Sequence, residues 1–126
     1  MSDDIRTIAL IAHDGRKPHM VQFAHNNADF LKRFRLVATG TTGGLLVDAG
    51  FDVQLLLSGP LGGDAQIGAM VAEGTCHAVI FFRDPLGKHP HDPDISMLMR
   101  LCDVHDVPLA TNLSTARLIV RSDRFA

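Results

Sequence analysis

Five short apolar runs alternate along the chain with longer segments in which apolar residues recur at helical spacing. The runs cover residues 7–12, 36–38, 53–57, 78–82 and 107–111. They are apolar almost throughout rather than at every second position, which is typical of strands buried on both faces of a parallel sheet. The pattern predicts an α/β fold: a three-layer α/β/α sandwich with a five-stranded parallel sheet and right-handed connections, the architecture of flavodoxin-like and Rossmann-type proteins.

Helix signals lie between these runs. Pro18 and Pro93 suit a first helical turn, where the missing N–H of proline has no intrahelical partner to lose. Asp92 and Ser114 suit N-cap positions. Helices are expected from residue 18, at 30–34, 45–49 and 65–73, from residue 92, and at 114–120.

Length and composition limit the possible classes of protein. A chain of 126 residues, 46% hydrophobic and 21% charged, predicts one globular domain that spans residues 1–126. The net charge of −2 argues against nucleic acid or an anionic membrane surface as a partner. No apolar run approaches the ~20 residues that a membrane-spanning helix needs.

The two cysteines, Cys76 and Cys102, lack the paired spacing of a zinc site. We expect both to be reduced thiols, one of them buried on an apolar helical face. The acidic segment at residues 1–4 has no apolar stretch, so no signal peptide is expected there. Together these features predict a cytoplasmic protein.

Residues that can do chemistry gather in the segments that follow the strands. In a parallel sheet these segments emerge at one edge, and loops on a rigid frame commonly carry binding residues, so we expect a single site there. The residues are His13, Asp14, Lys17, Thr39, Gly40, Thr41, Thr42, Ser58, Gly59, Asp64, Asp84, His91 and Asp94.

The turn at residues 58–64, Ser-Gly-Pro-Leu-Gly-Gly-Asp, lies between a strand and a helix. Its glycines and proline hold the backbone in a tight turn whose amides can approach a ligand closely. Asp64 is its only ionisable residue. The position at a helix start favours an N-cap, whereas the position above the sheet edge favours a carboxylate that meets a ligand.

The loop at residues 39–44, Thr-Gly-Thr-Thr-Gly-Gly, combines hydroxyls, glycine amides and a following helix. This combination suits a phosphate group, although a plain capped turn has a similar sequence. The loop matches neither the Walker motif nor the dinucleotide fingerprint. Lys17 is a candidate counter-charge for the phosphate.

The segment at residues 89–94, His-Pro-His-Asp-Pro-Asp, raises the alternative of a zinc or manganese site. Its prolines stiffen the loop and no third histidine follows at helical spacing, so we expect no metal. In a metal-free site His91 donates a hydrogen bond to a substrate oxygen, and Asp94 orients His91 or a neighbouring hydroxyl.

Six motifs taken together resemble the methylglyoxal synthase family, in the family's order, from about Ile8 to Val120. They are Ala-His-Asp, Ala-Thr-Gly-Thr-Thr-Gly, Leu-Ser-Gly-Pro-Leu-Gly-Gly-Asp, Phe-Phe-x-Asp-Pro, Pro-His-Asp-Pro-Asp and Val-Pro-x-Ala-Thr-Asn. The resemblance implies a lyase without a cofactor that converts glycerone phosphate to methylglyoxal and inorganic phosphate. It also implies a homo-oligomer, a hexamer or tetramer, often inhibited by phosphate.

The resemblance further implies roles for individual residues. Asp64 matches the family's catalytic base and His91 the residue that contacts the substrate carbonyl, while Asp14 and Asp94 match supporting carboxylates. The positions that match substrate binding, chiefly of the phosphate, are His13, Lys17, Thr39, Gly40, Thr41, Thr42, Ser58 and Gly59.

One family feature has no match in the sequence. Longer members carry a C-terminal arginine that reaches the phosphate in a neighbouring subunit's site, and the printed chain ends before such a residue. Arg83, Arg121 and Arg124 are candidates to replace it.

Two other functions stay open at this point. A regulatory binding module of the same fold, as at the end of the carbamoyl phosphate synthetase large subunit, needs the phosphate loop but not Asp64, His91 and Asp94 together. A phosphosugar isomerase shares the first proton transfer but returns the proton to the neighbouring carbon. The presence of all three residues favours the lyase over the module, because function follows from the site and not from the fold.

Overall fold

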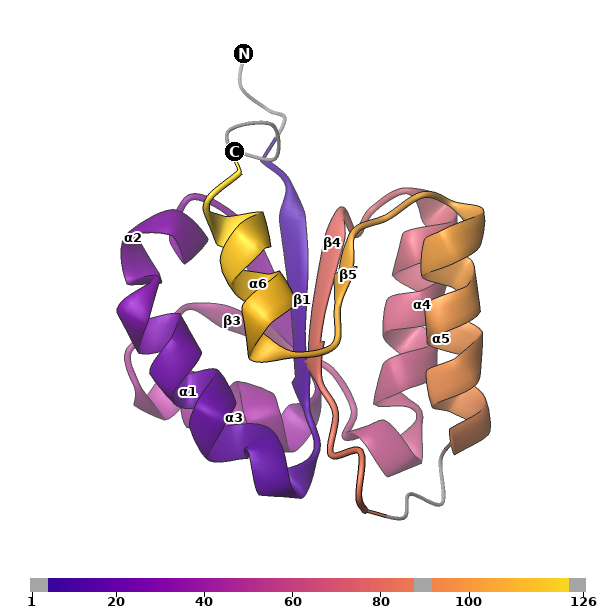
Figure 1. The fold of residues 1–126 in the computed structure, drawn as a ribbon, viewed down its shortest axis with the longest axis horizontal. Helices are drawn as coiled ribbons and strands as arrows, with labels where there is room; N and C mark the ends of the chain where they lie inside the picture. The colour runs from indigo at the N-terminus through magenta and orange to yellow at the C-terminus, as the bar shows by residue number, and fades with distance from the viewer. Residues whose placement is uncertain (1–4, 88–91, 123–126) are drawn as a thin grey trace.

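The computed structural model describes residues 5–87 and 92–122, which form a parallel sheet with helices on both faces (Figure 1). The five strands run in the order β3-β2-β1-β4-β5, and the predicted three-layer α/β/α architecture is confirmed. The strands are β1 (Thr7–Ala12), β2 (Arg35–Ala38), β3 (Val53–Leu55), β4 (Ala78–Phe82) and β5 (Leu109–Ala110).

Two layers of helices cover the sheet. One face carries α1 (Lys17–Asn26), α2 (Ala28–Leu31), α3 (Gly40–Asp48) and α6 (Leu113–Val120), and the other carries α4 (Gly63–Glu73) and α5 (Asp92–Val104) (Figure 1). Short 3₁₀ helices, η1 (Asp14–Arg16) and η2 (Gly59–Leu61), precede α1 and α4.

The central strands β1 and β4 are buried along their whole lengths, which explains their continuous apolar sequences. Successive side chains of β1 point to opposite faces. Leu10 therefore packs in the core that includes Phe23 of α1, whereas Ile11 packs in the core that includes Ile67 of α4. Parallel pairing, with Leu10 opposite both Ala38 and Ile80, brings the carboxyl ends of β2, β1 and β4 to one edge.

Helix α3 begins at Gly40, five residues earlier than predicted. The expected Thr/Gly loop is therefore the first turn and a half of a helix, with Gly43 N–H donating to the Thr39 carbonyl at 2.7 Å. Threonine and glycine are weak helix formers, but Thr42 and Gly43 are both buried against the rest of the protein. Tertiary packing overrides the local preference here.

The N-cap prediction for Ser114 is wrong, and of the two alternatives for Asp64 the N-cap is excluded. The N-cap of α4 is Gly62, with φ of 111°, a left-handed conformation that glycine adopts without steric cost. The N-cap of α6 is Asn112, whose Oδ1 accepts a hydrogen bond from Thr115 N–H at 3.0 Å. Asp64 lies inside the first turn of α4, beyond the N-cap position. Helix α5 begins at Asp92, whose side chain lies outside the described atoms.

Cys76 and Cys102 are both buried as free thiols in the core beneath α4 and α5. Burial raises the pKa of the Cys76 thiol to about 11. Burial, with a smaller contribution from the charge of Asp103, raises the pKa of Cys102 to about 11 as well. None of the helices in the described ranges combines the length and apolar character needed to cross a membrane.

We expect iodoacetamide to leave both thiols unmodified in the folded protein at mildly alkaline pH. The thiolate is the reactive form, and a pKa near 11 keeps each thiol protonated there. In denaturant both thiols should react, and mass spectrometry of the intact chain counts the adducts in each sample. A rapid adduct on the folded protein would contradict the burial of these side chains.

Candidate active site

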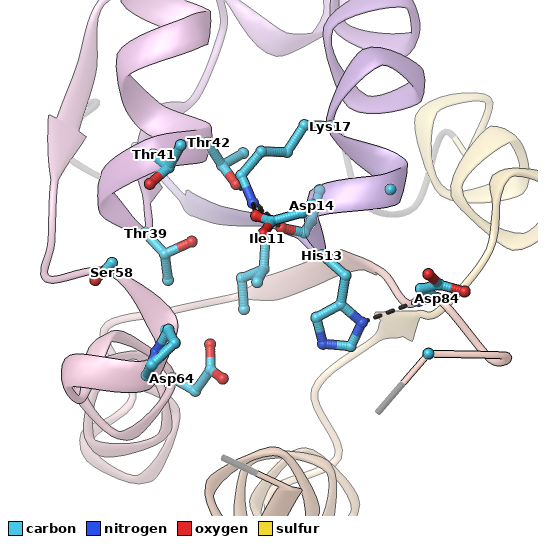
Figure 2. Close-up of a pocket in the computed structure, with 15 residues that line it drawn as sticks. Ile11, His13, Asp14, Lys17, Thr39, Thr41, Thr42, Ser58, Asp64 and Asp84 are labelled. Atoms are coloured by element: carbon cyan, nitrogen blue, oxygen red, sulfur yellow. Dashed lines mark hydrogen bonds and ion pairs between the residues drawn. The ribbon is translucent and has the colours of Figure 1, made fainter. Parts of the chain in front are cut away.

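A cavity of about 490 Å³ lies at the carboxyl ends of β1 and β4. Strand β2 pairs with one edge of β1, and β4 pairs with the other edge. The strand order therefore reverses between β1 and β4. Open α/β sheets bind ligands at such switch points. The cavity is lined by Ile11, Ala12, His13, Asp14, Gly15, Lys17, Thr39, Thr41, Thr42, Ser58, Gly59, Pro60, Asp64, Asp84 and Gly87 (Figure 2).

Most of the residues predicted for the site converge on this cavity. Gly40 and Asp94 are not among the lining residues: Gly40 N–H donates to the Leu57 carbonyl at 3.2 Å, and Asp94 is half-buried in the first turn of α5. His91 lies outside the described residues. The residues that do converge come from separate segments of the chain, as expected for side chains that follow parallel strands.

Asp64 is completely buried in the first turn of α4, and its carboxylate faces the cavity (Figure 2). Gly63 makes this placement possible. A Cβ atom at residue 63 would overlap the Leu57 carbonyl group and lie 2.8 Å from Thr39 Cγ2. The missing side chain lets the start of α4 lie directly against the segments that follow β2 and β3.

His13 is held in one orientation and one neutral tautomer. Its Nδ1 accepts a hydrogen bond from the Asp84 backbone N–H at 2.9 Å, and its ring packs edge-on against Phe81 with centroids 5.0 Å apart. Because Nδ1 acts as acceptor, the neutral ring carries its proton on Nε2. The imidazole is 5% exposed, so it presents a fixed N–H donor in the cavity wall.

Lys17 contributes a cationic side chain to the cavity. Its Nζ donates to the Ala12 carbonyl at 3.0 Å and to Asp14 Oδ1 at 2.7 Å, and its side chain is 14% exposed. The Ala12 carbonyl also accepts a bond from Thr42 Oγ1 at 3.4 Å. This one carbonyl at the end of β1 therefore positions both the ammonium group and the first turn of α3.

The first turn of α3 presents backbone donors to the cavity. Thr41 and Thr42 precede the first i→i−4 bond of the helix, and Thr39, the N-cap, makes no side-chain capping bond among the described residues. Such N–H groups and the positive end of the helix favour an anion. Together with Lys17 they make this side of the cavity suited to a phosphate group.

Asp84 is a lining residue to which the sequence assigned no role. It lies two residues after the end of β4, and its Oδ1 accepts a hydrogen bond from Leu86 N–H at 3.2 Å. A carboxylate within two residues of the end of a buried strand is the signal that identifies such a residue. Of the candidate replacement arginines, neither Arg83 nor Arg121 lines this cavity, and Arg124 lies outside the described residues.

The described ranges contain no cluster of three or more potential metal-ligating side chains. His89 and His91, which carried the alternative of a metal site, lie outside those ranges. A metal-free site therefore stays a prediction.

Comparisons with known proteins identify the family. A family model described as "MGS-like domain" matches residues 19–111. A methylglyoxal synthase of Ralstonia nicotianae is 59% identical over 91% of this chain and 86% of its own, and one of Clostridium botulinum is 53% identical over 90% and 97%. The crystal structure of methylglyoxal synthase from Elizabethkingia anophelis superposes with a TM-score of 0.90, at 43% identity over 96% of this chain and 80% of that one. These agreements in sequence and backbone show that the chain belongs to the methylglyoxal synthase family.

Proposed function

We propose that the protein is a carbon–oxygen lyase that converts glycerone phosphate to methylglyoxal and inorganic phosphate. One observation carries the proposal: a fully buried carboxylate, Asp64, shares a cavity with the first turn of α3 and with Lys17. The carboxylate suits proton abstraction, and the helix start and the ammonium group suit a phosphate. The reaction needs the carboxylate and the phosphate-binding groups in the same cavity.

Asp64 acts as the base. A hydrogen on the hydroxymethyl carbon beside the ketone is weakly acidic, and its removal leaves an enediolate. Burial excludes bulk water from the carboxylate, which keeps the proton transfer within the site. Removing a proton in this way contributes about 10²–10⁴-fold to the rate of a typical enzyme.

Histidines stabilise the charge that develops on the enediolate oxygen. We assign this contact to His91, as the sequence predicts, with neutral imidazole as the donor. His13 offers a second, preorganised N–H on Nε2, held by the Asp84 amide at 2.9 Å. Fixed donors of this kind cost little reorganisation as charge appears. Asp14 and Asp94 are proposed to orient these groups and the substrate hydroxyls.

Loss of phosphate follows when the bridging C–O bond lies perpendicular to the enediolate plane, because the π electrons then enter the breaking bond. We propose that Thr39, Thr41, Thr42 and the Ser58–Gly59 segment hold the phosphate out of that plane. Figure 2 shows the threonines of α3 on one side of the cavity and Asp64 on another, which suits such a twist. A complex with an enediolate analogue whose phosphate lay in the plane would refute this arrangement.

Product analysis tests the function. Purified protein is incubated with glycerone phosphate and a metal chelator, and methylglyoxal and free phosphate are quantified together. Equal amounts of the two products support the lyase. An aldehyde phosphate indicates an isomerase, and unchanged substrate indicates a binding module.

Lys17→Ala is expected to raise KM for glycerone phosphate roughly 10-fold or more, because a hydrogen bond to a charged group contributes about 1.5–3 kcal/mol. The effect on kcat should be smaller, since the phosphate is bound in both ground and transition states. Steady-state phosphate release over a range of substrate concentrations separates the two constants. Lys32→Ala, an exposed lysine outside the cavity, is the control. A fall in kcat at unchanged KM contradicts the assignment.

We further propose that the chain forms a homo-oligomer, a hexamer or tetramer, in the cytoplasm. Exposed apolar side chains at the β3 edge of the sheet, on α3, β3, η2 and the segment between β3 and η2, support an assembly; they include Leu45, Val47, Leu55, Leu57 and Leu61. The two free thiols suit a reducing compartment. Light scattering gives the assembly size.

Inorganic phosphate, the proposed product, is expected to inhibit by occupying the start of α3.

A further inference from the structure

The segment at residues 56–58, between β3 and η2, joins two parts of the cavity wall. The chain enters that wall at Ser58 and Gly59. Just before them, the Leu57 carbonyl accepts a hydrogen bond from Gly40 N–H, at the start of α3, at 3.2 Å. A Cβ atom at Gly40 would lie 3.3 Å from Ser58 N, so the start of α3 and this segment are in direct contact. The position of the segment therefore determines how the two walls meet.

A side chain of α4 holds this segment by its backbone. Leu56 N–H still donates to the Ala38 carbonyl of β2 at 2.8 Å, in continuation of the sheet. Leu57 N–H instead donates to Gln66 Oε1 at 2.8 Å. Since an N–H group needs an acceptor, this bond also fixes which way the amide of Gln66 faces. Within the described ranges it is the only side-chain hydrogen bond to the backbone of residues 56–58.

Helix α4 is the rigid partner in this bond. Gln66 N–H donates to the Gly62 carbonyl at 3.0 Å, in the first turn of the helix. Helical side chains point back toward the N-terminus, so the amide of Gln66 reaches the segment that precedes the helix. The next residue, Ile67, is completely buried in the core beneath α4 and α5, whereas Leu57 is 50% exposed. The bond therefore restrains the segment more than the helix.

Gln66 acts on the cavity only through this segment, because it is not among the lining residues. The N–H groups of Ser58 and Gly59 donate to no acceptor within the described ranges. Successive backbone donors of this kind, in a cavity that also holds Lys17, suit an anionic oxygen. A binding segment that is already held in place loses less conformational freedom when a ligand binds.

We propose that Gln66 is a positioning residue for the phosphate. By accepting the hydrogen bond from Leu57 N–H, it keeps the backbone of Ser58 and Gly59 in the conformation that binds the anion. The inference rests on the proposed function, because the phosphate of glycerone phosphate is the group concerned. It adds to that function a residue outside the cavity that sets the affinity for phosphate.

Gln66→Met tests the proposal, because it removes the acceptor oxygen and keeps the length and helix propensity of the side chain. Gln66 is exposed, so the variant should fold. The Kd of inorganic phosphate, from calorimetric titration, and KM for glycerone phosphate should both rise about 2- to 10-fold, the value of one hydrogen bond. The effect on kcat should be smaller, since Asp64 stays on the rigid helix.

Gln22→Met is the matched control. Gln22 is exposed on α1, outside the cavity, and its Nε2 donates to Asn26 Oδ1 at 3.0 Å. The same substitution there also removes a side-chain hydrogen bond, and it should leave Kd, KM and kcat unchanged. Lys17→Ala should weaken the binding of inorganic phosphate, which places the titrated ion in the cavity.

Several results would overturn the proposal. If Gln66→Met lowered the unfolding temperature but left Kd and KM as in the parent, the bond would be structural only. If kcat fell while Kd and KM were unchanged, the bond would serve Asp64 and not the phosphate. Phosphate that failed to saturate the parent, or that bound Lys17→Ala as tightly, would also refute it. Gln66→Ala should repeat the effect, and normal binding by that variant would assign the loss to the introduced thioether.

The two measurements separate this proposal from the proposed function. Calorimetry with inorganic phosphate needs no turnover, so its result stands whether or not the parent makes methylglyoxal. A parent that forms no methylglyoxal overturns the function and leaves the comparison of Kd values intact. A parent that forms methylglyoxal, with equal Kd and KM in Gln66→Met, overturns the positioning role alone.

Discussion

Asp64→Asn is expected to lower kcat for phosphate release by about 10²–10⁴-fold, because the carboxamide does not accept a proton at neutral pH. KM for glycerone phosphate should change little, since the groups proposed to hold the phosphate are untouched. The side chain keeps its shape, and a completely buried charge is removed, so the fold should persist. Initial rates with a chelator present, followed by thermal unfolding of the same sample, measure both quantities.

Asp48→Asn is the matched control for this experiment. It makes the same chemical change at an exposed carboxylate in the last turn of α3, outside the cavity, and should leave kcat unaltered. If Asp64→Asn turned over substrate nearly as fast as the parent, the base would have to be another group. If it lost substrate binding as well, Asp64 would hold the substrate rather than react with it.

Gly63→Ala is expected to reduce both stability and activity. The added methyl group would overlap the Leu57 carbonyl and approach Thr39 Cγ2 to 2.8 Å. Backbone atoms cannot rotate away, so the start of α4 must shift. Overpacking of this kind costs about 1–3 kcal/mol in the free energy of unfolding. A shift of about 1 Å at Asp64 is enough to lower the rate about 10²-fold.

Gly44→Ala provides the contrast, since a Cβ at residue 44 has no neighbour within 4 Å and the residue lies inside α3. That variant should gain about 0.5–1 kcal/mol from improved helix propensity. Thermal unfolding and initial rates of the two variants are compared side by side. Equal stability of Gly63→Ala and the parent would show that the close approach of α4 to the Leu57 carbonyl is not required.

The fold was predictable because the apolar runs that form its central strands can be recognised in the sequence. Strands buried on both faces need apolar residues at every position, and the chain shows such runs at residues 7–12 and 78–82, with the bounds that β1 and β4 have in the structure. The same periodicity argument fails for the first turn of α3. Thr42 and Gly43 are helical because they are buried against other elements, and not because of their sequence pattern. Sequence alone does not report that contact.

The grouping of the candidate site residues was predictable where residue type and strand position agree. Asp64, Lys17 and the threonines of α3 follow strands and line one cavity. The partners within the site were not predictable, because they are backbone groups. The Ala12 carbonyl that holds Lys17 and Thr42, and the Asp84 amide that holds His13, carry no signature in side-chain chemistry.

The hydrogen bond from the Asp84 backbone N–H to His13 Nδ1 has a consequence for mutagenesis. A main-chain donor survives every side-chain replacement except proline, so alanine scanning at residue 84 reports on the carboxylate and never on the imidazole. The tautomer of His13 is thus encoded by the path of the backbone after β4. It is inherited with the topology, and among replacements of residue 84 only proline removes the donor.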